Sequence, residues 1–370
     1  MNLAVCTAIA VSGAILASCS DDEPANGGGN GSGEIELSDA GVMAYYTGDY
    51  YEVGTGNVYI NFTQGDITAE YDEFDDLTGY SGTGSVLCID INQALSSDPD
   101  QVVLTAGTYT VDASESYAAG TVNGSDSYLL DVVDGVATEC TFTSGSVAIE
   151  SLGDKIYKFD YDFVGSNGAA VKGSYTVLCR VINRSEEGVM SNLDADVEAK
   201  DLTEALFVYE GDLYETGESD IYLIMMGDKD FDIETNYGPG NSIMLSLCVE
   251  PGSSNGIPAG TYDAFVDIDT AEELPVGSCI AGMYYWGQYL GCWYFNDTLQ
   301  YESSLCGGSL TVANDGGAYT IGGTLLDGKG RSVEIRYSGT PVIIDDTRAS
   351  THRASVHRAS VRKAASKVRK

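Results

Sequence analysis

The sequence predicts an all-β protein with two tandem homologous domains, each an antiparallel β-sandwich or a small β-barrel. Three observations carry this prediction. The composition, with 45 Gly and 25 Tyr among 370 residues, favours strands and tight turns over helices. Short runs alternate polar and apolar residues. The first half of the chain also resembles the second half, segment by segment.

The clearest alternating run spans residues 155–163, Lys-Ile-Tyr-Lys-Phe-Asp-Tyr-Asp-Phe. Successive side chains of a strand point to opposite faces, so this run predicts a strand with one buried face. Turn signals such as Asp134-Gly135 and Asp327-Gly328 separate the runs. About seven or eight antiparallel strands in each copy fit either a sandwich or a barrel, and both architectures stay open.

An internal repeat divides the chain into a β domain at 37–200 and a second β domain at 201–345. Its clearest match is residues 46–54 with 209–217, an offset of 163 at which Tyr59 meets Tyr222. Further matches follow in the same order: 106–109 with 259–262, and 145–147 with 308–310. A unit of this length is too long for a solenoid repeat, so a duplicated domain is expected.

The first residues have the features of a secreted, lipid-modified protein. Residues 1–18 are apolar and end in Leu-Ala-Ser before Cys19, and acidic residues follow at 21–23. This stretch resembles the signal peptides of bacterial lipoproteins, and its acidic run resembles the export signal of Bacteroidota surface lipoproteins. The resemblance implies lipid attachment at Cys19 and an outer-membrane position facing the cell exterior. The Gly, Ser, Asn, Asp and Glu that follow Cys19 predict a flexible tether at 19–36. The apolar run is short for a transmembrane helix, which is the alternative.

The charge distribution limits the partners. The formal net charge is −38, yet eight of the 18 Lys and Arg fall within residues 346–370. The field of the body repels nucleic acid and anionic headgroups but tolerates neutral sugars and cations. The basic tail at 346–370 has little apolar content and is expected to be disordered. It is either an arm for an acidic polymer or a reading-frame artefact.

Several kinds of chemistry have no support in the body of the chain. Both histidines, His352 and His357, lie in the tail, so neither histidine-assisted nucleophilic catalysis nor a zinc site is expected. A glycosidase needs only two carboxylates, but 56 acids leave no pair singled out. The acidic segments 72–76 and 228–234 could hold calcium, although neither is an EF-hand loop and exposed strands look similar. We predict no catalytic residue, no metal and no cofactor.

Seven cysteines remain after Cys6 and Cys19 are set aside, an odd number that forbids complete pairing within one chain. Three lie in strand-like runs and are expected to be buried free thiols: Cys88, Cys179 and Cys248. The better candidates for a disulfide are Cys279, Cys292 and Cys306, and the pairing stays open.

The most suggestive segment is 283–295, which holds both tryptophans of the chain. Aromatic rings that stack on sugars, with amides nearby for the hydroxyls, are supplied by the candidate binding residues Tyr284, Trp286, Gln288, Tyr289 and Trp293. A binding surface requires at least two of these rings to be exposed together. The alternative is a hairpin whose aromatic residues fill the core.

These features predict a cell-surface lipoprotein that acts as a non-catalytic binding module for glycans. Its expected partners are the membrane, through the lipid anchor, and a polysaccharide or protein ligand. The alternative is an adhesin or structural surface protein that contacts other proteins. A glycoside hydrolase is a third hypothesis.

Overall fold

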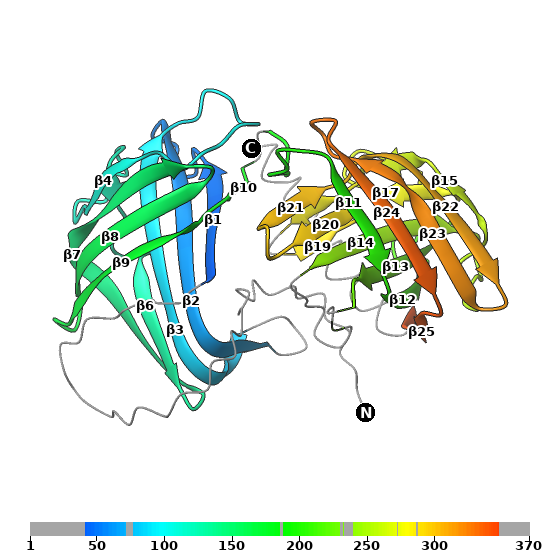
Figure 1. Cartoon of the computed structure of the whole chain (residues 1–370), viewed down its shortest axis with the longest axis horizontal. Helices are drawn as coiled ribbons and strands as arrows, with labels where there is room; N and C mark the ends of the chain where they lie inside the picture. The colour runs from blue at the N-terminus through cyan, green and yellow to red at the C-terminus, as the bar shows by residue number, and fades with distance from the viewer. Residues whose placement is uncertain are drawn as a thin grey trace. The chain divides into compact units, whose positions relative to one another are not determined.

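A computed structural model gives the fold. It describes residues 41–71, 77–185, 188–229, 232, 240–271, 273–285 and 288–347. All 25 regular elements in these ranges are β-strands, so the all-β prediction is confirmed (Figure 1). Within the same ranges we find no helix with the length and apolarity that crossing a bilayer requires. The chain divides into two units, Met1–Gly188 and Val189–Lys370.

The first unit is one 10-stranded sheet with the order β10-β1-β2-β3-β5-β4-β7-β8-β9, in which β6 pairs with both β3 and β7. The pairings β3–β5–β4–β7–β6–β3 therefore form a closed ring. The bounds are β1 Gly41–Gly48, β2 Thr55–Tyr71, β3 Leu77–Ala94, β4 Gly107–Val111, β5 Thr121–Val122, β6 Tyr128–Val133, β7 Val136–Gly153, β8 Ile156–Gly165, β9 Ala170–Leu178 and β10 Val181–Asn183.

The core of the first unit forms where this sheet curves back on itself. In β8 the alternation predicted from the sequence is present, and Tyr157, Phe159, Tyr161 and Phe163 are all buried. Phe159 meets Phe62 of β2 edge to face, with 5.1 Å between the ring centroids. Each such side chain stabilises the fold by about 2 kcal/mol through removal of apolar surface from water.

The second unit has two larger sheets and a short hairpin, β18–β19. One sheet has the order β11-β24-β23-β22-β15 and the other β16-β17-β14-β13-β12-β25; β20 also pairs with β14, and β21 pairs with β20. The bounds are β11 Val197–Leu202, β12 Glu204–Gly211, β13 Asp220–Gly227, β14 Asn241–Val249, β15 Gly260–Tyr262, β16 Ala264–Val266, β17 Ser278–Ile280, β18 Met283–Tyr285, β19 Gln288–Leu290, β20 Trp293–Asn296, β21 Tyr301–Ser304, β22 Gly307–Asp315, β23 Ala318–Leu326, β24 Ser332–Gly339 and β25 Val342–Asp345.

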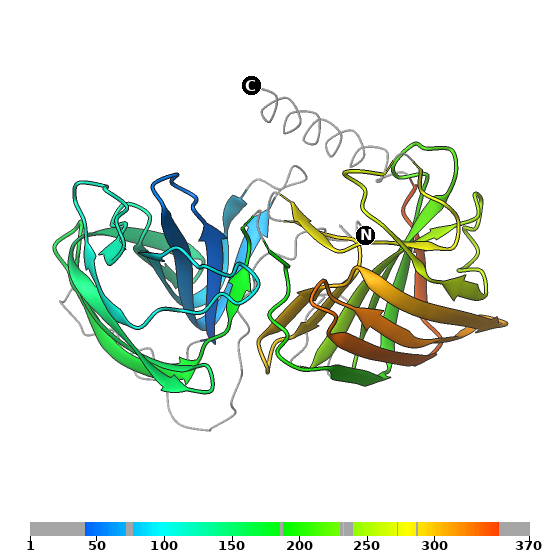
Figure 2. The ribbon, with the colours of Figure 1, turned by 90° about the horizontal axis from the view of Figure 1, so that it is seen from above.

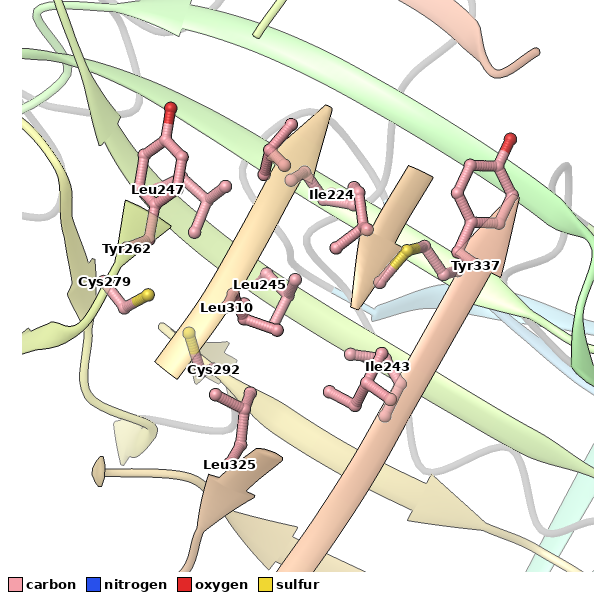
Figure 3. Packing of buried hydrophobic residues seen from close by; sticks show 14 of the residues in the cluster. Ile224, Ile243, Leu245, Leu247, Tyr262, Cys279, Cys292, Leu310, Leu325 and Tyr337 are labelled. Carbon is pink, nitrogen blue, oxygen red and sulfur yellow. The ribbon is translucent and has the colours of Figure 1, made fainter. Parts of the chain in front are cut away.

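The two sheets of this unit pack as a sandwich, seen from above in Figure 2. Figure 3 shows side chains of one sheet, such as Ile243 and Leu245, in the same core as Leu310 and Tyr337 of the other. The predicted domain boundary at residue 200 lies inside β11. That strand pairs with β24 of the second unit, so the observed division comes earlier, at Gly188.

The two units share one strand order. The run β10-β1-β2-β3 corresponds to β25-β12-β13-β14, and β4-β7-β8-β9 corresponds to β15-β22-β23-β24. Both first hairpins have a register shift at the same place, Tyr46/Gly48 and Tyr209/Gly211. These details support the repeat, while the domain bounds 37–200 and 201–345 stay predictions.

One match of the repeat is wrong by one residue. Tyr59 pairs with Tyr45 on β1, whereas Tyr222 pairs with Tyr209 on β12. Because Tyr209 corresponds to Tyr46, Tyr59 is equivalent to Leu223 rather than to Tyr222. Tyr222 accordingly lies in the core, while Tyr59 lies on the opposite face of its sheet.

Lysines lie on two strands at the ends of these sheets. Lys172 of β9 pairs with Asp162, at 2.8 Å between Nζ and Oδ2. Lys200 of β11 lies 3.1 Å from Glu198 and 2.8 Å from Glu334, measured from Nζ to the carboxylate oxygens. All of these side chains are substantially exposed, so each ion pair adds little to stability.

Candidate functional site

The aromatic segment predicted from the sequence is largely built into the second unit. Trp293 lies in β20 and pairs with Met244 of β14; its side chain is fully buried, and Nε1 donates to the Leu290 carbonyl at 2.7 Å. Tyr289 is also buried, and its hydroxyl donates to Glu302 Oε2 at 2.8 Å. The expectation that these two rings present faces to a ligand is wrong, because both are buried against each other. Trp293 lies on the face of β20 opposite the core residue Tyr294 and meets Tyr289 of the β18–β19 hairpin edge to face, at 4.9 Å between centroids.

The rest of the predicted site is only partly visible. Tyr284 is half-buried and meets Tyr289 edge to face at 5.1 Å between centroids. Trp286 and the side chain of Gln288 lie outside the described residues. Below this hairpin, burial and the charge of Glu302 raise the pKa of Asp297 to about 6. A ligand site here stays a prediction that rests on Tyr284 and Trp286.

A second group of aromatic and acidic side chains lies on the outer face of the first unit. The facing pairs Val58–Ile91 and Ile60–Ile89 point into the core, so the alternate pairs Asn57–Asn92 and Tyr59–Asp90 point outward. The loops 49–54 and 112–127 cover this face. We call the group the tyrosine–carboxylate cluster and define it as Tyr50, Tyr51, Tyr59, Tyr117, Asp90 and Asp126.

Three of the tyrosines form an aromatic group at the surface. The rings of Tyr51 and Tyr117 stack with 3.9 Å between centroids and 8° between planes. Tyr50 meets Tyr51 edge to face at 5.0 Å, and its side chain is 63% exposed. Rings gathered in this way at a surface can bind the apolar face of another ring.

Asp90 lies beneath these rings and is fully buried. Its carboxylate accepts a hydrogen bond from Asn57 Nδ2, and the Tyr51 hydroxyl lies 3.2 Å from Asp90 Oδ2. The same hydroxyl lies 3.2 Å from Asp126 Oδ2. Burial raises the pKa of Asp90 to about 6, although hydrogen bonds from its neighbours oppose the rise.

Two acidic turns present the surface tyrosines. Asp49 accepts backbone hydrogen bonds from Val53 and Gly54, both at 2.9 Å to Oδ1. Asp112 accepts them from Ser114 at 2.9 Å and from Ser116 at 3.0 Å. Hydrogen bonds from the two serines hold the pKa of Asp112 well below its usual range. Short side chains that bond the following backbone are typical of such turns, which explains why these sequences fold locally.

Tyr117 follows the second turn in a left-handed backbone conformation with φ of 53°. The Thr55 hydroxyl donates to its carbonyl at 2.8 Å, which holds the loop against the start of β2. A non-glycine residue with positive φ costs about 1 kcal/mol or more, so the surrounding contacts keep this tyrosine in place.

One buried amide atom near Asp90, Asn92 Oδ1, has no hydrogen-bond partner among the described residues, although Asn92 Nδ2 donates to Asn123 Oδ1 at 2.8 Å. Asn123 also donates its backbone N–H to the Asp90 carbonyl at 2.9 Å. Buried polar groups are nearly always paired, so Asn92 Oδ1 is a place where a water or a ligand donor would bind.

The equivalent face of the second unit has a different character. Strand register makes Ile221 equivalent to Asn57, Ser246 to Asp90 and Cys248 to Asn92. There Ile221 and Cys248 belong to a small apolar cluster that also contains Leu274 and Ile280. The shared fold therefore does not require the polar cluster of the first unit.

The sequence did not predict this cluster, because the aromatic content of a short segment does not show which distant segments come together. Its members come from three separate stretches, 50–59, 90 and 117–126. One signal was available: Asp90 stands between Ile89 and Ile91 in an apolar run. An acid inside such a run marks either an outward face or a buried carboxylate with partners.

In the described ranges no group of three or more His, Cys, Asp or Glu side chains is arranged to hold a metal. The acidic segment 72–76 and most of 228–234 lie outside those ranges. Comparison with protein-family models, with curated proteins and with solved structures finds no match for this chain.

Proposed function

We propose that the chain is a cell-surface lipoprotein that binds glycans without modifying them, through the tyrosine–carboxylate cluster of the first unit. The observation that carries the proposal is the grouping of Tyr50, Tyr51 and Tyr117 at the surface above a buried acid and amides. Sugars offer an apolar ring face and many hydroxyls. Aromatic rings match the face, and carboxylates and amides match the hydroxyls.

The charge of the chain narrows the ligand to neutral glycans. With a formal net charge of −38, the protein repels sulfated or uronic-acid polymers at low ionic strength. Asp90 and Asp126 add negative charge at the site itself. The cluster contains no basic side chain to offset an anionic ligand.

A glycan array with the full chain, followed by isothermal titration calorimetry, tests the binding function. Tyr117→Ala is expected to weaken binding of an array hit roughly fivefold to tenfold, because one stacking face is lost. Tyr284→Ala is the matched control, since it removes a half-buried tyrosine of the other candidate segment. If Tyr284→Ala weakens binding and Tyr117→Ala does not, the site belongs to the second unit. An array without any glycan hit rejects the function, and a protein ligand would favour the adhesin hypothesis.

The proposed anchor is Cys19, supported by the Leu-Ala-Ser-Cys sequence and the acidic run after it. Cys19→Ala is expected to abolish incorporation of radiolabelled palmitate and to release the protein from the membrane fraction. Digestion of whole cells with a protease tests whether the protein faces outward. Unchanged membrane association of the variant would reject the lipid anchor.

A further inference from the structure

The second unit contains two thiols that the core brings together. Cys279 lies in β17, and Cys292 lies between β19 and β20. Both side chains are fully buried in the same hydrophobic cluster. Figure 3 shows their sulfur atoms directed toward each other. Hydrogen bonding with Cys292, together with burial, raises the pKa of the Cys279 thiol well above its usual value.

The backbone around the two thiols is also in close contact. A Cβ atom on Gly282 would lie 2.1 Å from the Cys292 carbonyl oxygen, and one on Gly291 would lie 2.2 Å from that of Ala281. Leu305 links the same segments, because its carbonyl accepts from Gly282 at 3.0 Å and its N–H donates to Cys292 at 2.9 Å. The backbone around Gly282 therefore lies in close contact with the backbone around Gly291.

We propose that Cys279 and Cys292 form a disulfide that closes the base of the β18–β19 hairpin. This inference is independent of the proposed glycan site. The closed segment contains Tyr284 and Tyr289, which pair across the hairpin. The link would fix a loop that is otherwise attached to the unit through short strands of 3 residues each.

Neighbouring thiols are less suited to the same bond. Cys248 lies in the separate apolar cluster on the outer face of the sheet, and Cys306 is exposed. With seven cysteines in the body, pairing of Cys279 with Cys292 leaves five thiols.

The bond requires an oxidant of the disulfide class, such as oxidised glutathione or an exported disulfide oxidoreductase. One cysteine thiolate attacks the oxidant's S–S bond, forms a mixed disulfide and releases one thiol. The second thiolate then attacks the mixed disulfide, which forms the protein S–S bond and releases the second thiol. The two protein thiols lose two protons and two electrons, and the oxidant gains them. Because both thiols are buried in the folded unit, the reaction belongs to folding, before the core closes.

Peptide mapping of the full chain tests the link. The protein is refolded in a mixture of oxidised and reduced glutathione, alkylated, and digested with chymotrypsin without reduction. Chymotrypsin cleaves after aromatic residues between the two cysteines, so a 279–292 disulfide joins two peptides that separate after reduction. We expect that joined pair. Alkylated Cys279 and Cys292 on separate peptides, or a link from either one to Cys248 or Cys306, would overturn the proposal.

A thermal melt gives a second readout. Reduction is expected to lower the Tm of the oxidised chain by roughly 5–10 °C, from the loss of a loop closure of this length. The double variant Cys279→Ser/Cys292→Ser should melt at the same temperature with and without reductant. Cys306→Ser is the matched control and should keep the response. A chain whose Tm ignores reductant, with the link mapped and intact beforehand, would show that the bond does not stabilise the hairpin.

Discussion

The outer faces of the two units are built on equivalent strands, but one buries polar side chains and the other buries apolar side chains. In the first unit Asn57, Asp90 and Asn92 bury polar groups beneath a layer of tyrosines. In the second unit the equivalent positions are Ile221, Ser246 and Cys248, and the face is covered by apolar contacts. Burying a carboxylate without a cation is unfavourable, whereas burying Ile221 is favourable.

The difference teaches where to look for function. Both units have the same strand order, so the fold accepts either kind of side chain on this face. The free energy of folding favours the apolar side chains. A polar version that carries a buried acid and an unpaired amide oxygen is less stable, and such sites are commonly retained for binding. The comparison therefore points to the first unit, although the aromatic content of the sequence points to the second.

The largest expected effect comes from placing a polar residue of the first unit at the equivalent buried position of the second unit. Ile221→Asn should destabilise the second unit by roughly 4 kcal/mol, because it removes a buried side chain and leaves an amide without partners. Hydrogen–deuterium exchange of peptides from each unit measures this loss locally. Leu299→Asn, at a site that is 45% exposed, is the control and should change little. Equal effects at the two positions would mean that the apolar cluster is not a real core.

The second effect concerns the buried acid. Since folding raises the pKa of Asp90 from 3.8 to about 6, the folded state holds its proton more tightly than the unfolded chain. Stability from this group is thus present below pH 4 and is lost as the pH rises through 6, by up to about 3 kcal/mol. Asp90→Asn should remove that loss, so the variant should be more stable than the parent at pH 8.

Urea unfolding at pH 4, 6 and 8 measures the Asp90 contribution, with signals assigned to the first unit by exchange of its peptides. Asp126→Asn is the control, because that carboxylate is exposed and should leave the slope unchanged. If the free energy of unfolding changes with pH in the same way in the parent and in Asp90→Asn, ionisation of Asp90 does not destabilise the folded unit.

The third effect tests what the units share. Gly145 and Gly308 have φ of 119° and 104°, and an added Cβ would lie 2.2 and 2.1 Å from a carbonyl oxygen of the next strand. Alanine at either site should cost roughly 2 kcal/mol in its own unit, through backbone strain and the clash. Gly260→Ala, in open space, is the control. A large difference between the two glycines would break the structural equivalence.

The smallest effect comes from the matched turns. Asp49 and Asp212 both accept hydrogen bonds from backbone N–H groups four and five residues later. Asp49→Ala and Asp212→Ala should each cost about 1 kcal/mol, since the N–H groups are exposed and water replaces the lost partner. Local exchange rates measure both losses. Unequal losses would indicate that the turn has a further role in one unit. Tyr50 of the tyrosine–carboxylate cluster follows Asp49 directly, so that role is expected in the first unit.

The sequence was most informative where one segment alone determines the outcome. The alternation at 155–163 predicts β8 and its buried face, because period two is a property of the strand itself. The turn at Asp134-Gly135 falls between β6 and β7 as expected. The repeat was detected, yet Tyr59 was matched to Tyr222 because identity at a fixed offset cannot register a one-residue difference in the preceding loop.

The site was less predictable because it depends on register between distant segments. Trp293 is buried because Tyr289 of the β18–β19 hairpin packs against it, a contact that the aromatic pattern does not encode. Likewise, Tyr51 and Tyr117 become stacked only once the loops fold over the paired strands β2 and β3. The composition of the cluster was visible in the sequence, and its assembly was not.

The lysines of β9 and β11 bear on how the chain behaves at high density. An end strand offers unpaired N–H and C=O groups to any neighbouring copy, and a charged side chain makes that pairing unfavourable. Lys172 and Lys200 place such charges on two end strands. Lys172 pairs with Asp162 of the adjacent strand, and Lys200 pairs with Glu334 of the adjacent strand and Glu198 of its own. The two lysines therefore oppose edge-to-edge pairing of copies at high concentration, and exchanging both for valine is expected to promote aggregation.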